Sequence, residues 1–440
     1  MTERPNRSRN RERHRSPTVS VLAALALVVA CGVFVLANHL AGGSPETDNG
    51  DTDPVEPINS SPPMTSLVTP SAQPPDTEEP APGQKVPAVV VKGMYIDAWT
   101  LAAQIDRFIE ICNNSEINAI VIDIKDENGL IPFLCGDASF SAATRNIIPD
   151  IEQFLARLKE NGIYTIGRLV CFKDNLWSSR NPGLAIRGRD GADWADQGGV
   201  SWLNPYNTGA WDYIATLALE SARLGFDEIQ LDYVRFPADG RLSDIDFGLA
   251  GAEKTKAEAI GDFLQYMRGV MEDTGVWLSA DVFGIIAVAR GDFEGIGQDL
   301  EIMVRHVDYV CPMIYPSHFA NERQNGVGQY INGVLYSRPD LEPYGVIYNI
   351  LVMTMNRMPE DGNHAVIRPY LQAFTANYLG SGYFMPYTAH EVLEQIRAVY
   401  DAGLDEWILW NHSGRYELYD DVALLLSTEN DVATVTSTNP

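Results

Sequence analysis

The segment Gly225–Pro237, GFDEIQLDYVRFP, carries an unusual concentration of charge for a predicted strand. Side chains alternate along a strand, so Glu228, Gln230 and Asp232 share one face, while the opposite face is apolar and suits packing against helices. A buried carboxylate is costly unless it is paired or functional. Because Asp232 lies nearest the strand end, it is the first catalytic candidate. The alternative is a scaffold role in which an arginine, Arg168 or Arg235, holds it.

A second carboxylate lies on the next predicted strand, Trp277–Gly284, with the sequence WLSADVFG. The alternation places Ser279 and Asp281 on one face, with Asp281 at the strand end beside Asp232. Glycoside hydrolysis requires two carboxyl groups, one to protonate the leaving oxygen and one to attack the sugar or activate water. Mutual repulsion helps to keep one of them protonated. The alternative for Asp281 is an internal hydrogen-bond acceptor.

An acidic cluster follows Ile117 on another predicted strand, where Asp123 and Lys125 share a face and Asp126 comes next. Such a cluster can bind a divalent cation, but no histidine or second DxD motif supports a metal. We therefore expect neither a metal nor a cofactor, and favour a contact with sugar hydroxyls or a scaffold ion pair. Asp123 and Glu228 are reserve catalytic candidates.

Polar and aromatic residues also recur where the other predicted strands end. The candidates for binding substrate are Asp97, Trp99, Lys125, Arg168, Arg235, Tyr315, Gln372, Trp410 and Asn411. Aromatic rings at such positions suit stacking on sugar faces, although each alone is as compatible with ordinary packing. Serine-hydrolase, P-loop, dinucleotide-binding and HExxH motifs are missing from the sequence, which disfavours those chemistries.

These residues need a scaffold that brings strand ends together. Between Val89 and Leu425 eight short β-branched segments alternate, for the most part, with stretches of helical periodicity. The predicted strands are Val89–Trp99, Ile117–Asp126, Ile163–Phe172, Asp227–Phe236, Trp277–Gly284, Val307–Pro316, Ile367–Phe374 and Glu406–Asn411. The predicted helices include Ile151–Asn161, Ala210–Leu224, Thr255–Met271 and Ala389–Ala402. This order predicts an α/β fold, a (β/α)8 TIM barrel, in which all C-terminal strand ends converge on one face. Residues 325–343 are expected to form a loop at that face.

The N-terminal residues are predicted to direct the protein to the membrane rather than to form part of the folded domain. Residues 1–18 are rich in arginine, and the uncharged run Val19–Leu36 is just long enough to cross a bilayer. We expect a cytoplasmic tail (1–18), a single transmembrane anchor (19–38), a disordered linker rich in Pro, Ser, Thr and acidic residues (39–88), the barrel (89–427) and a disordered tail (428–440). A cleaved signal peptide is the alternative to the anchor. The predicted location is the cell membrane, single-pass, with an extracytoplasmic catalytic domain.

The composition narrows the partners. The formal net charge is −27, and a chain this acidic repels the phosphate backbone of nucleic acids. We therefore expect no nucleic-acid partner, but a polysaccharide or oligosaccharide, and the membrane through the N-terminal helix. Cys112 and Cys135 are close enough in sequence to permit a disulfide, but all cysteines after the anchor are interpreted as structural.

From about Val91 to Tyr416 the chain resembles a bacterial family of TIM-barrel glycoside hydrolases, formerly a domain of unknown function. The resemblance is carried by KGMY at 92–95, NAIVIDIKD at 118–126, the segment 168–174, the DYVRFP core at 232–237, SADVFG at 279–284, GQDL at 297–300, PMIYPSH at 312–318 and DEWILWN at 405–411. The strand with Asp232 is also distantly similar to the DxxDxDxE strand of chitinases. Val234 stands where the chitinase glutamate belongs, which disfavours substrate-assisted chemistry and favours Asp232.

The sequence thus predicts a glycoside hydrolase acting on an extracellular or cell-wall polysaccharide. Asp232 would be nucleophile or base and Asp281 the acid. Two alternatives stay open: a glycan-binding or wall-scaffolding protein on a degenerate barrel, and a metal-dependent hydrolase or lyase with Asp123 and Asp126 as ligands.

Overall fold

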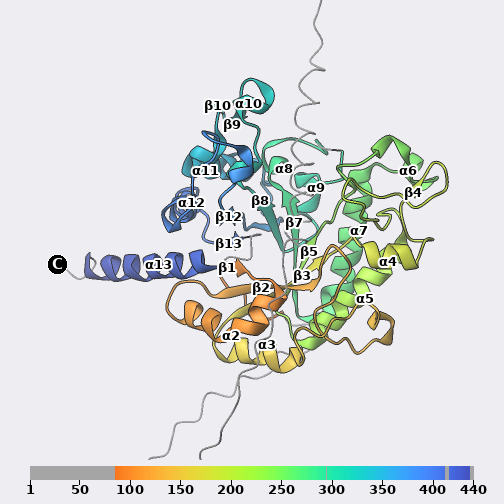
Figure 1. Ribbon diagram of the computed structural model, residues 1–440, viewed down its shortest axis with the longest axis horizontal. Helices are drawn as coiled ribbons and strands as arrows, with labels where there is room; N and C mark the ends of the chain where they lie inside the picture. The colour runs from red at the N-terminus through yellow and green to blue at the C-terminus, as the bar shows by residue number, and fades with distance from the viewer. Residues whose placement is uncertain (1–84, 294, 412–415, 437–440) are drawn as a thin grey trace, which may run out of the picture.

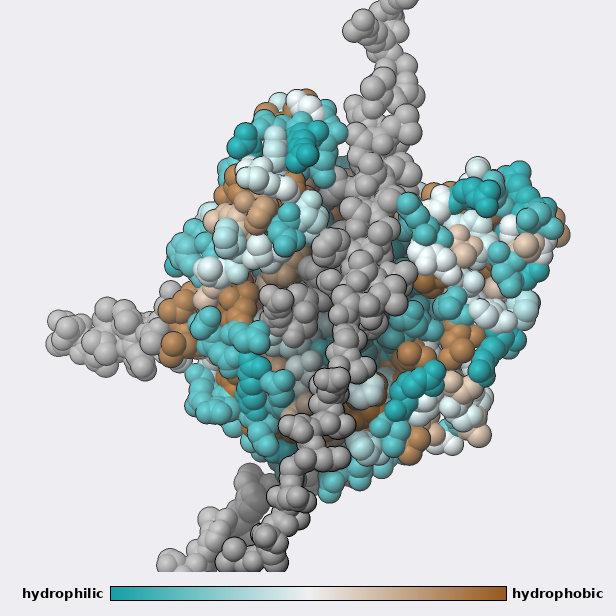
Figure 2. Space-filling view, viewed as in Figure 1, coloured by the Kyte–Doolittle hydropathy of each residue, from teal (hydrophilic) through white to brown (hydrophobic). Residues whose placement is uncertain are grey.

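The computed structural model describes residues 85–436 apart from 294 and 412–415, and Figure 1 shows them as helices packed around a central group of strands. The predicted cytoplasmic tail, membrane anchor and nearly all of the linker lie outside these residues. Within the described part of the chain, no helix has the length and apolar character needed to span a membrane. On the face shown in Figure 2, hydrophilic residues predominate and hydrophobic ones form separate patches.

The strands form one closed parallel sheet. In order around it lie β11 (Val366–Ile367), β8 (Tyr309–Met313), β12 (Tyr370–Gln372), β13 (Trp407–Trp410), β1 (Lys92–Tyr95), β2 (Ala119–Lys125), β3 (Tyr164–Val170), β5 (Glu228–Asp232) and β7 (Trp277–Phe283). Pairing of β7 with β8 closes the ring. Since β11 and β12 together fill one position, the sheet has the eight positions of the predicted TIM barrel, and that prediction is confirmed.

Helices surround the strands. In the described part of the chain they are α2 (Ala98–Asn113), α3 (Ile151–Glu160), α4 (Asn175–Arg180), α5 (Thr208–Leu224), α6 (Ala250–Glu253), α7 (Lys256–Met271), α8 (Gly284–Val288), α9 (Leu300–Met303), α10 (Glu322–Asn325), α11 (Pro343–Met355), α12 (Ala389–Asp401) and α13 (Glu417–Thr436). The four predicted helices are confirmed to within two residues at each end. Their caps explain these ends: a capping box opens α7 at Thr255, another opens α12 at Thr388, and Gly225 follows α5 with φ +109°.

The barrel separates apolar from polar side chains by strand face. Ile229, Leu231 and Leu169 are fully buried against the helices, within the large apolar core. The lumen is filled instead by a smaller cluster rich in tyrosine, including Tyr95, Tyr164 and Tyr370, together with buried charged and amide groups. The polar faces predicted for β5 and β7 therefore do point into the barrel.

Two strands differ from the sequence prediction. The first strand ends at Tyr95 because Asp97 caps α2 by accepting a hydrogen bond from Thr100 N, so Trp99 lies on a helix. The seventh strand splits at Arg368 and Pro369; proline has no N–H to donate to a ladder.

The region 325–343 is more structured than the expected loop. It contains the hairpin of β9 (Gln329–Ile331) and β10 (Val334–Tyr336) and leads into α11, which the sequence reading did not identify. The last helix, α13, continues into the segment that the sequence assigns to the tail.

Candidate active site

Asp232 is the last residue of β5 and points into the barrel at its C-terminal end. The chain turns sharply after it, since Tyr233 adopts φ +47°, a strained conformation for a bulky residue. This turn brings the Tyr233 N–H to 2.6 Å from Asp232 Oδ1. Asp232 Oδ2 accepts two hydrogen bonds from Arg168, from Nε at 2.8 Å and from Nη2 at 2.5 Å. The carboxylate is thus held in one orientation by charge-assisted hydrogen bonds from the guanidinium.

Arg168, on β3, binds a second carboxylate. Its Nη1 donates to Asp123 Oδ1 at 2.7 Å, and the Tyr95 hydroxyl donates to Asp123 Oδ2 at 2.8 Å. Burial raises the pKa of Asp123, although Arg168 and Tyr95 act against this. Burial also disfavours the charge on Arg168, but the two carboxylates outweigh it and raise the pKa of Arg168 well above its usual value. Three sequence-predicted residues, Asp123, Arg168 and Asp232, therefore form one ion-pair network.

Asp281, on β7, lies beside this network without sharing it. Its side chain is 2% exposed, and among the described residues Oδ1 has no hydrogen-bond partner. Burial raises the pKa of Asp281 well above its usual value, and the neighbouring charge of Asp232 raises it further. Asp281 is therefore a buried carboxyl group with a raised pKa, next to an arginine-held carboxylate. Two carboxyl groups whose environments differ in this way suit an acid and a base or nucleophile.

Glu228, a reserve catalytic candidate, lies elsewhere. It is the first residue of β5, fully buried at the opposite end of the barrel, where Arg368 Nη1 donates to both its oxygens at 2.8 and 2.9 Å. Arg368 also donates to Glu406 at 2.6 Å. Between the two charged layers, Tyr370 donates to Gln230 at 2.6 Å. The structure thus gives Glu228 a scaffold ion pair and removes it from the predicted site.

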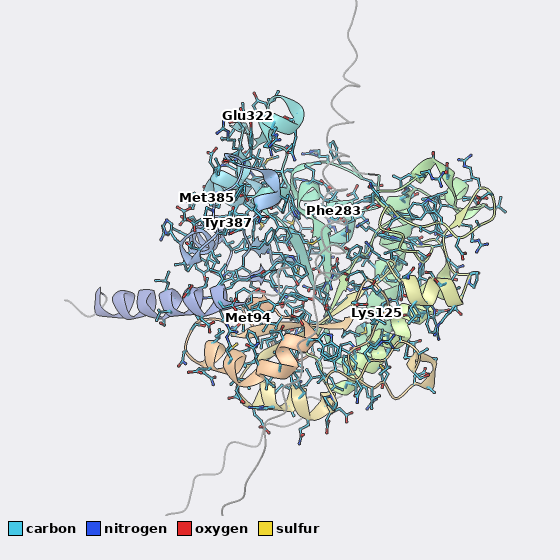
Figure 3. The ribbon with its side chains drawn as sticks, in the orientation of Figure 1. Met94, Lys125, Phe283, Glu322, Met385 and Tyr387 are labelled. Carbon is cyan, nitrogen blue, oxygen red and sulfur yellow. The ribbon has the colours of Figure 1, made fainter. Side chains whose placement is uncertain are left out.

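The prediction that Asp123 and Lys125 share a face is wrong. The pairing of β2 with β3 shifts register between these residues, and this irregularity turns Lys125 out of the lumen. Its Nζ contacts Asp174 Oδ2 at 2.5 Å and lies 4.8 Å from the Tyr213 ring centroid, with no exposed surface. Lys125, labelled in Figure 3 near the end of β2, joins strand to helix and has no surface for a sugar.

Two other predicted binding residues have structural partners. Gln372 is fully buried and donates to Asp340 at 2.9 Å while accepting from Ser317 N at 3.1 Å. Asp97 caps α2 and accepts from Tyr416 at 3.3 Å. Trp99 is 69% exposed on the first turn of α2, so its ring is accessible to solvent.

The predicted aromatic residues lie closer to the network. Trp410, at the end of β13, packs on Tyr95 with ring centroids 4.3 Å apart and has Arg168 5.5 Å from its centroid. Tyr315 is buried, and burial raises the pKa of its hydroxyl well above the usual value, with further increases from the charges of Asp281 and Asp232. Asn411 follows Trp410 and is buried. Trp410 and Tyr315 therefore help to line the top of the barrel, as expected.

Sequence reasoning overlooked two functional candidates near Asp232. Tyr95 orients Asp123 and was visible only as part of the KGMY motif. Glu127, in the loop after β2, is partly exposed. The pKa of Asp126 is raised to about 6, first by the burial of Asp126 and second by the negative charge of Glu127. Asp126 Oδ1 accepts from both Asn128 N at 2.9 Å and Leu130 N at 2.7 Å, so this carboxylate shapes a turn.

Arg235 and Lys173 both lie close to the Tyr233 ring, at 4.9 and 5.3 Å from its centroid. The Arg235 guanidinium is 4.5 Å from the centroid of Phe283, the last residue of β7, which Figure 3 labels. Lys173 contacts Asp196 at 3.2 Å.

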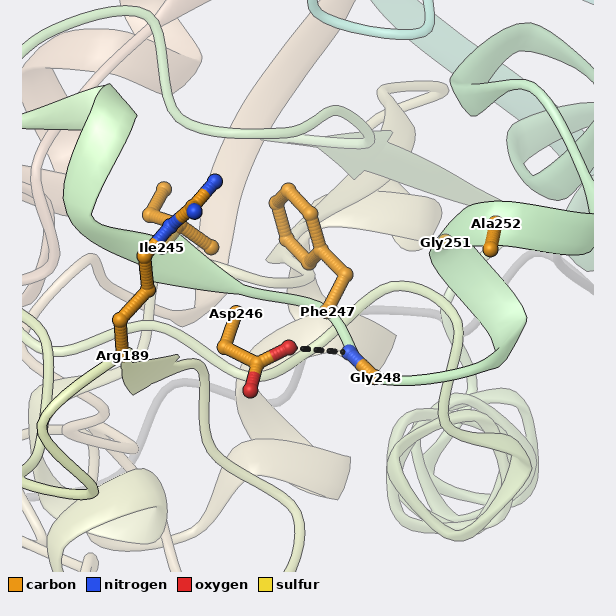
Figure 4. Close-up of a pocket in the computed structure, with 7 residues that line it drawn as sticks. All are labelled: Arg189, Ile245, Asp246, Phe247, Gly248, Gly251 and Ala252. Carbon is orange, nitrogen blue, oxygen red and sulfur yellow. Dashed lines mark hydrogen bonds between the residues drawn. The ribbon is translucent and has the colours of Figure 1, made fainter.

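A separate hollow of about 530 Å³ lies in the loops, lined by Arg189, Ile245, Asp246, Phe247, Gly248, Gly251 and Ala252 (Figure 4). None of the network carboxylates lines it.

The described residues contain no group of three or more histidine, cysteine or acidic side chains placed to hold a metal ion. Cys112, Cys135, Cys171 and Cys311 are all free thiols, so the permitted disulfide between the first two is not formed.

Residues 93–416 match the protein family described as "Putative glycosyl hydrolase domain". The chain belongs to this family. The family resemblance noted from the sequence motifs is thereby confirmed, and it covers nearly the whole barrel. A comparison with curated proteins found no match.

Several solved structures are similar to this chain, and the first of those named below supports the fold. The glycoside hydrolase domain of PgaB (BpsB) from Bordetella bronchiseptica is 13% identical, with a TM-score of 0.54 over 77% of this chain and 98% of that one. A hypothetical protein from Ruminiclostridium thermocellum is 37% identical over 43% of this chain and 97% of that one, with a TM-score of 0.40. A chitinase from Chromobacterium violaceum is 12% identical over 76% and 98%, with a TM-score of 0.42. As a member of the family, the protein has a glycosyl hydrolase domain.

Proposed function

We propose that the protein hydrolyses O-glycosidic bonds of an extracellular or cell-wall polysaccharide, using Asp281 as acid and Asp232 as nucleophile or base. The observation that carries the proposal is the different environment of these two carboxyl groups on adjacent strands. Arg168 holds Asp232 with two hydrogen bonds, whereas burial and the charge of Asp232 raise the pKa of Asp281.

In the proposed reaction the Asp281 proton passes to the glycosidic oxygen as its bond to the anomeric carbon breaks. As nucleophile, Asp232 forms a bond to that carbon, and water then hydrolyses the resulting glycosyl ester with Asp281 as the base. As base, Asp232 instead takes a proton from the water that attacks the carbon directly. Arg168 and the Tyr233 N–H keep the Asp232 carboxylate oriented, and Asp123 neutralises the second side of the guanidinium. Trp410 and Tyr315 would contact the sugar beside them.

The test uses the full-length chain against a panel of bacterial wall and capsular glycans, with release of new reducing ends as the readout. The expected result is release by the wild type and a loss of at least about 100-fold in Asp232→Asn, the lower range for a lost catalytic group. Binding should persist, because asparagine keeps the shape of the side chain. Undiminished turnover by Asp232→Asn would exclude this residue from catalysis.

One observation favours a second candidate, a non-catalytic glycan-binding protein on the same barrel. Asp232 and Asp281 are only 5% and 2% exposed, as in a scaffold. This alternative predicts saturable glycan binding without product and no effect of Asp281→Asn on that binding. Product release by the wild type that Asp281→Asn abolishes would exclude it.

We also propose that the barrel is extracytoplasmic and tethered to the cell membrane by residues 19–38. The support is the uncharged run Val19–Leu36 behind an arginine-rich start. Protease added to intact cells should remove the barrel while leaving the N-terminal segment with the membrane fraction. Protection of the barrel, or its recovery from the medium, would refute the tether.

A further inference from the structure

Arg235, three residues after Asp232, is a buried cation that forms no ion pair with any of the described residues. Two other arginines are buried to a similar extent, and each contacts two carboxylates: Arg168 pairs with Asp123 and Asp232, and Arg368 with Glu228 and Glu406. Arg235 is 6% exposed, and its one hydrogen bond runs from Nη1 to the Phe236 carbonyl at 2.9 Å. Burying an unpaired charge is costly, so this exception needs a cause.

Aromatic rings hold the Arg235 guanidinium in place. It lies 5.0 Å from the centroid of Trp202, 4.9 Å from Tyr233 and 4.5 Å from Phe283. Such contacts stabilise a cation but leave the N–H groups at its edge unused. Nε and Nη2 of Arg235 have no hydrogen-bond partner among the described residues, and both atoms keep some contact with solvent. The group is rigid and retains free donors.

The neighbouring carboxylates are already engaged. Asp232 is bound to Arg168, and Asp196 accepts from Trp202 Nε1 at 3.1 Å and Val200 N at 2.9 Å as well as from Lys173. Lys173 lies 5.3 Å from the centroid of the Tyr233 ring, on which Arg235 also packs. Two cations therefore flank one tyrosine at the barrel rim, within a chain of net charge −27.

We propose that Arg235, assisted by Lys173, binds a carboxylate of the substrate, so that the polysaccharide contains uronic acid residues. A guanidinium matches a carboxylate with two parallel hydrogen bonds. This rests on the proposed function in one respect: the position of Arg235 beside Asp232 places the acidic sugar next to the bond that is cleaved. Anion binding itself does not depend on catalysis.

The first experiment is a calorimetric titration of the full-length chain with sodium glucuronate, sodium sulfate and glucose. Saturable glucuronate binding is expected, at least tenfold weaker in Arg235→Met and partly retained in Arg235→Lys, which keeps the charge but loses the fork. The control Arg145→Met removes a charge from an exposed arginine that bonds only backbone carbonyls and should leave binding unchanged. Circular dichroism verifies that each variant is folded.

The second experiment separates this inference from the proposed function. Acidic polysaccharides are compared with their carboxyl-reduced forms, for binding and for hydrolysis. Preference for the acidic form that Arg235→Met removes, even without any hydrolysis, supports the anion site while the glycosidase proposal fails. Hydrolysis of reduced and acidic forms at equal rates overturns the anion site while the glycosidase proposal stands. Equal glucuronate affinity in wild type and Arg235→Met, or equal affinity for sulfate, also overturns the carboxylate assignment.

Discussion

Replacing Arg168 by methionine tests whether the polar layer at the top of the barrel is one electrostatic unit. The substitution removes three hydrogen bonds, two to Asp232 and one to Asp123, and leaves two carboxyl groups buried without their cation. Breaking a buried pair by removing one partner costs about 3–5 kcal/mol. We expect a loss of that size in the free energy of unfolding at pH 8.

The loss should depend on pH, with a sign that the structure fixes. Burial already raises the folded-state pKa of Asp123, and Arg168 opposes this rise; without Arg168 that pKa climbs further. A raised folded-state pKa means that the folded protein takes up protons, so stability is retained at low pH and lost as pH rises through that pKa. The destabilisation by Arg168→Met should therefore be smaller at pH 5 than at pH 8.

The assay is urea unfolding of wild type and Arg168→Met, followed by circular dichroism at both pH values. Arg145→Met provides the control for loss of an exposed positive charge and should change stability by less than about 0.5 kcal/mol. Adding Asp232→Asn to Arg168→Met should restore part of the loss at pH 8, since one uncompensated charge is gone. An equal loss at both pH values, or one below about 1 kcal/mol, would refute the shared network.

Two further predictions concern individual side chains. Because burial raises the folded-state pKa of Asp281, wild-type stability should fall as pH rises through that value. Asp281→Asn should therefore unfold at a higher urea concentration than wild type at alkaline pH, and its glycan turnover should drop at least about 100-fold. Equal stability of the two proteins at alkaline pH would contradict the role assigned to Asp281. Lys125→Met should lower the free energy of unfolding by about 3–5 kcal/mol without changing KM, because it leaves the buried Asp174 carboxylate without its cation. The control Lys159→Met breaks a half-exposed pair with Asp227 and should cost less than about 1 kcal/mol. A changed KM in folded Lys125→Met would return Lys125 to the binding site.

Much of the barrel could be predicted because its signals are local. Alternation along β5 separates Glu228 and Asp232 from Ile229 and Leu231, and the structure sends these two groups to the lumen and the helices as expected. Helix α7 begins where a capping box places it. The inward direction of Asp281 follows from the same period of two.

The predictions that the structure did not confirm concern residues whose position depends on partners distant in sequence. No pattern around Lys125 announces the register shift of β2, which follows from its pairing with β3. Glu228 and Asp232 look alike in the sequence, yet Arg368, 140 positions away from Glu228, makes one of them a scaffold residue. The split of the seventh strand at Pro369 was visible in composition, but only the closed ring shows that two short strands fill one position.

The barrel interior is a stack of polar layers, and its asymmetry bears on the assignment of acid and base. Glu228 has its own arginine at the bottom of the lumen, and Asp232 and Asp123 share Arg168 at the top. Asp281 is buried next to that layer, its Oδ1 has no hydrogen-bond partner among the described residues, and burial and the charge of Asp232 raise the pKa of its carboxyl group. Asp232, in contrast, accepts a hydrogen bond from the Arg168 guanidinium at 2.5 Å. If the barrel cleaves glycosidic bonds, these charges favour proton donation from β7 and attack or base catalysis from β5.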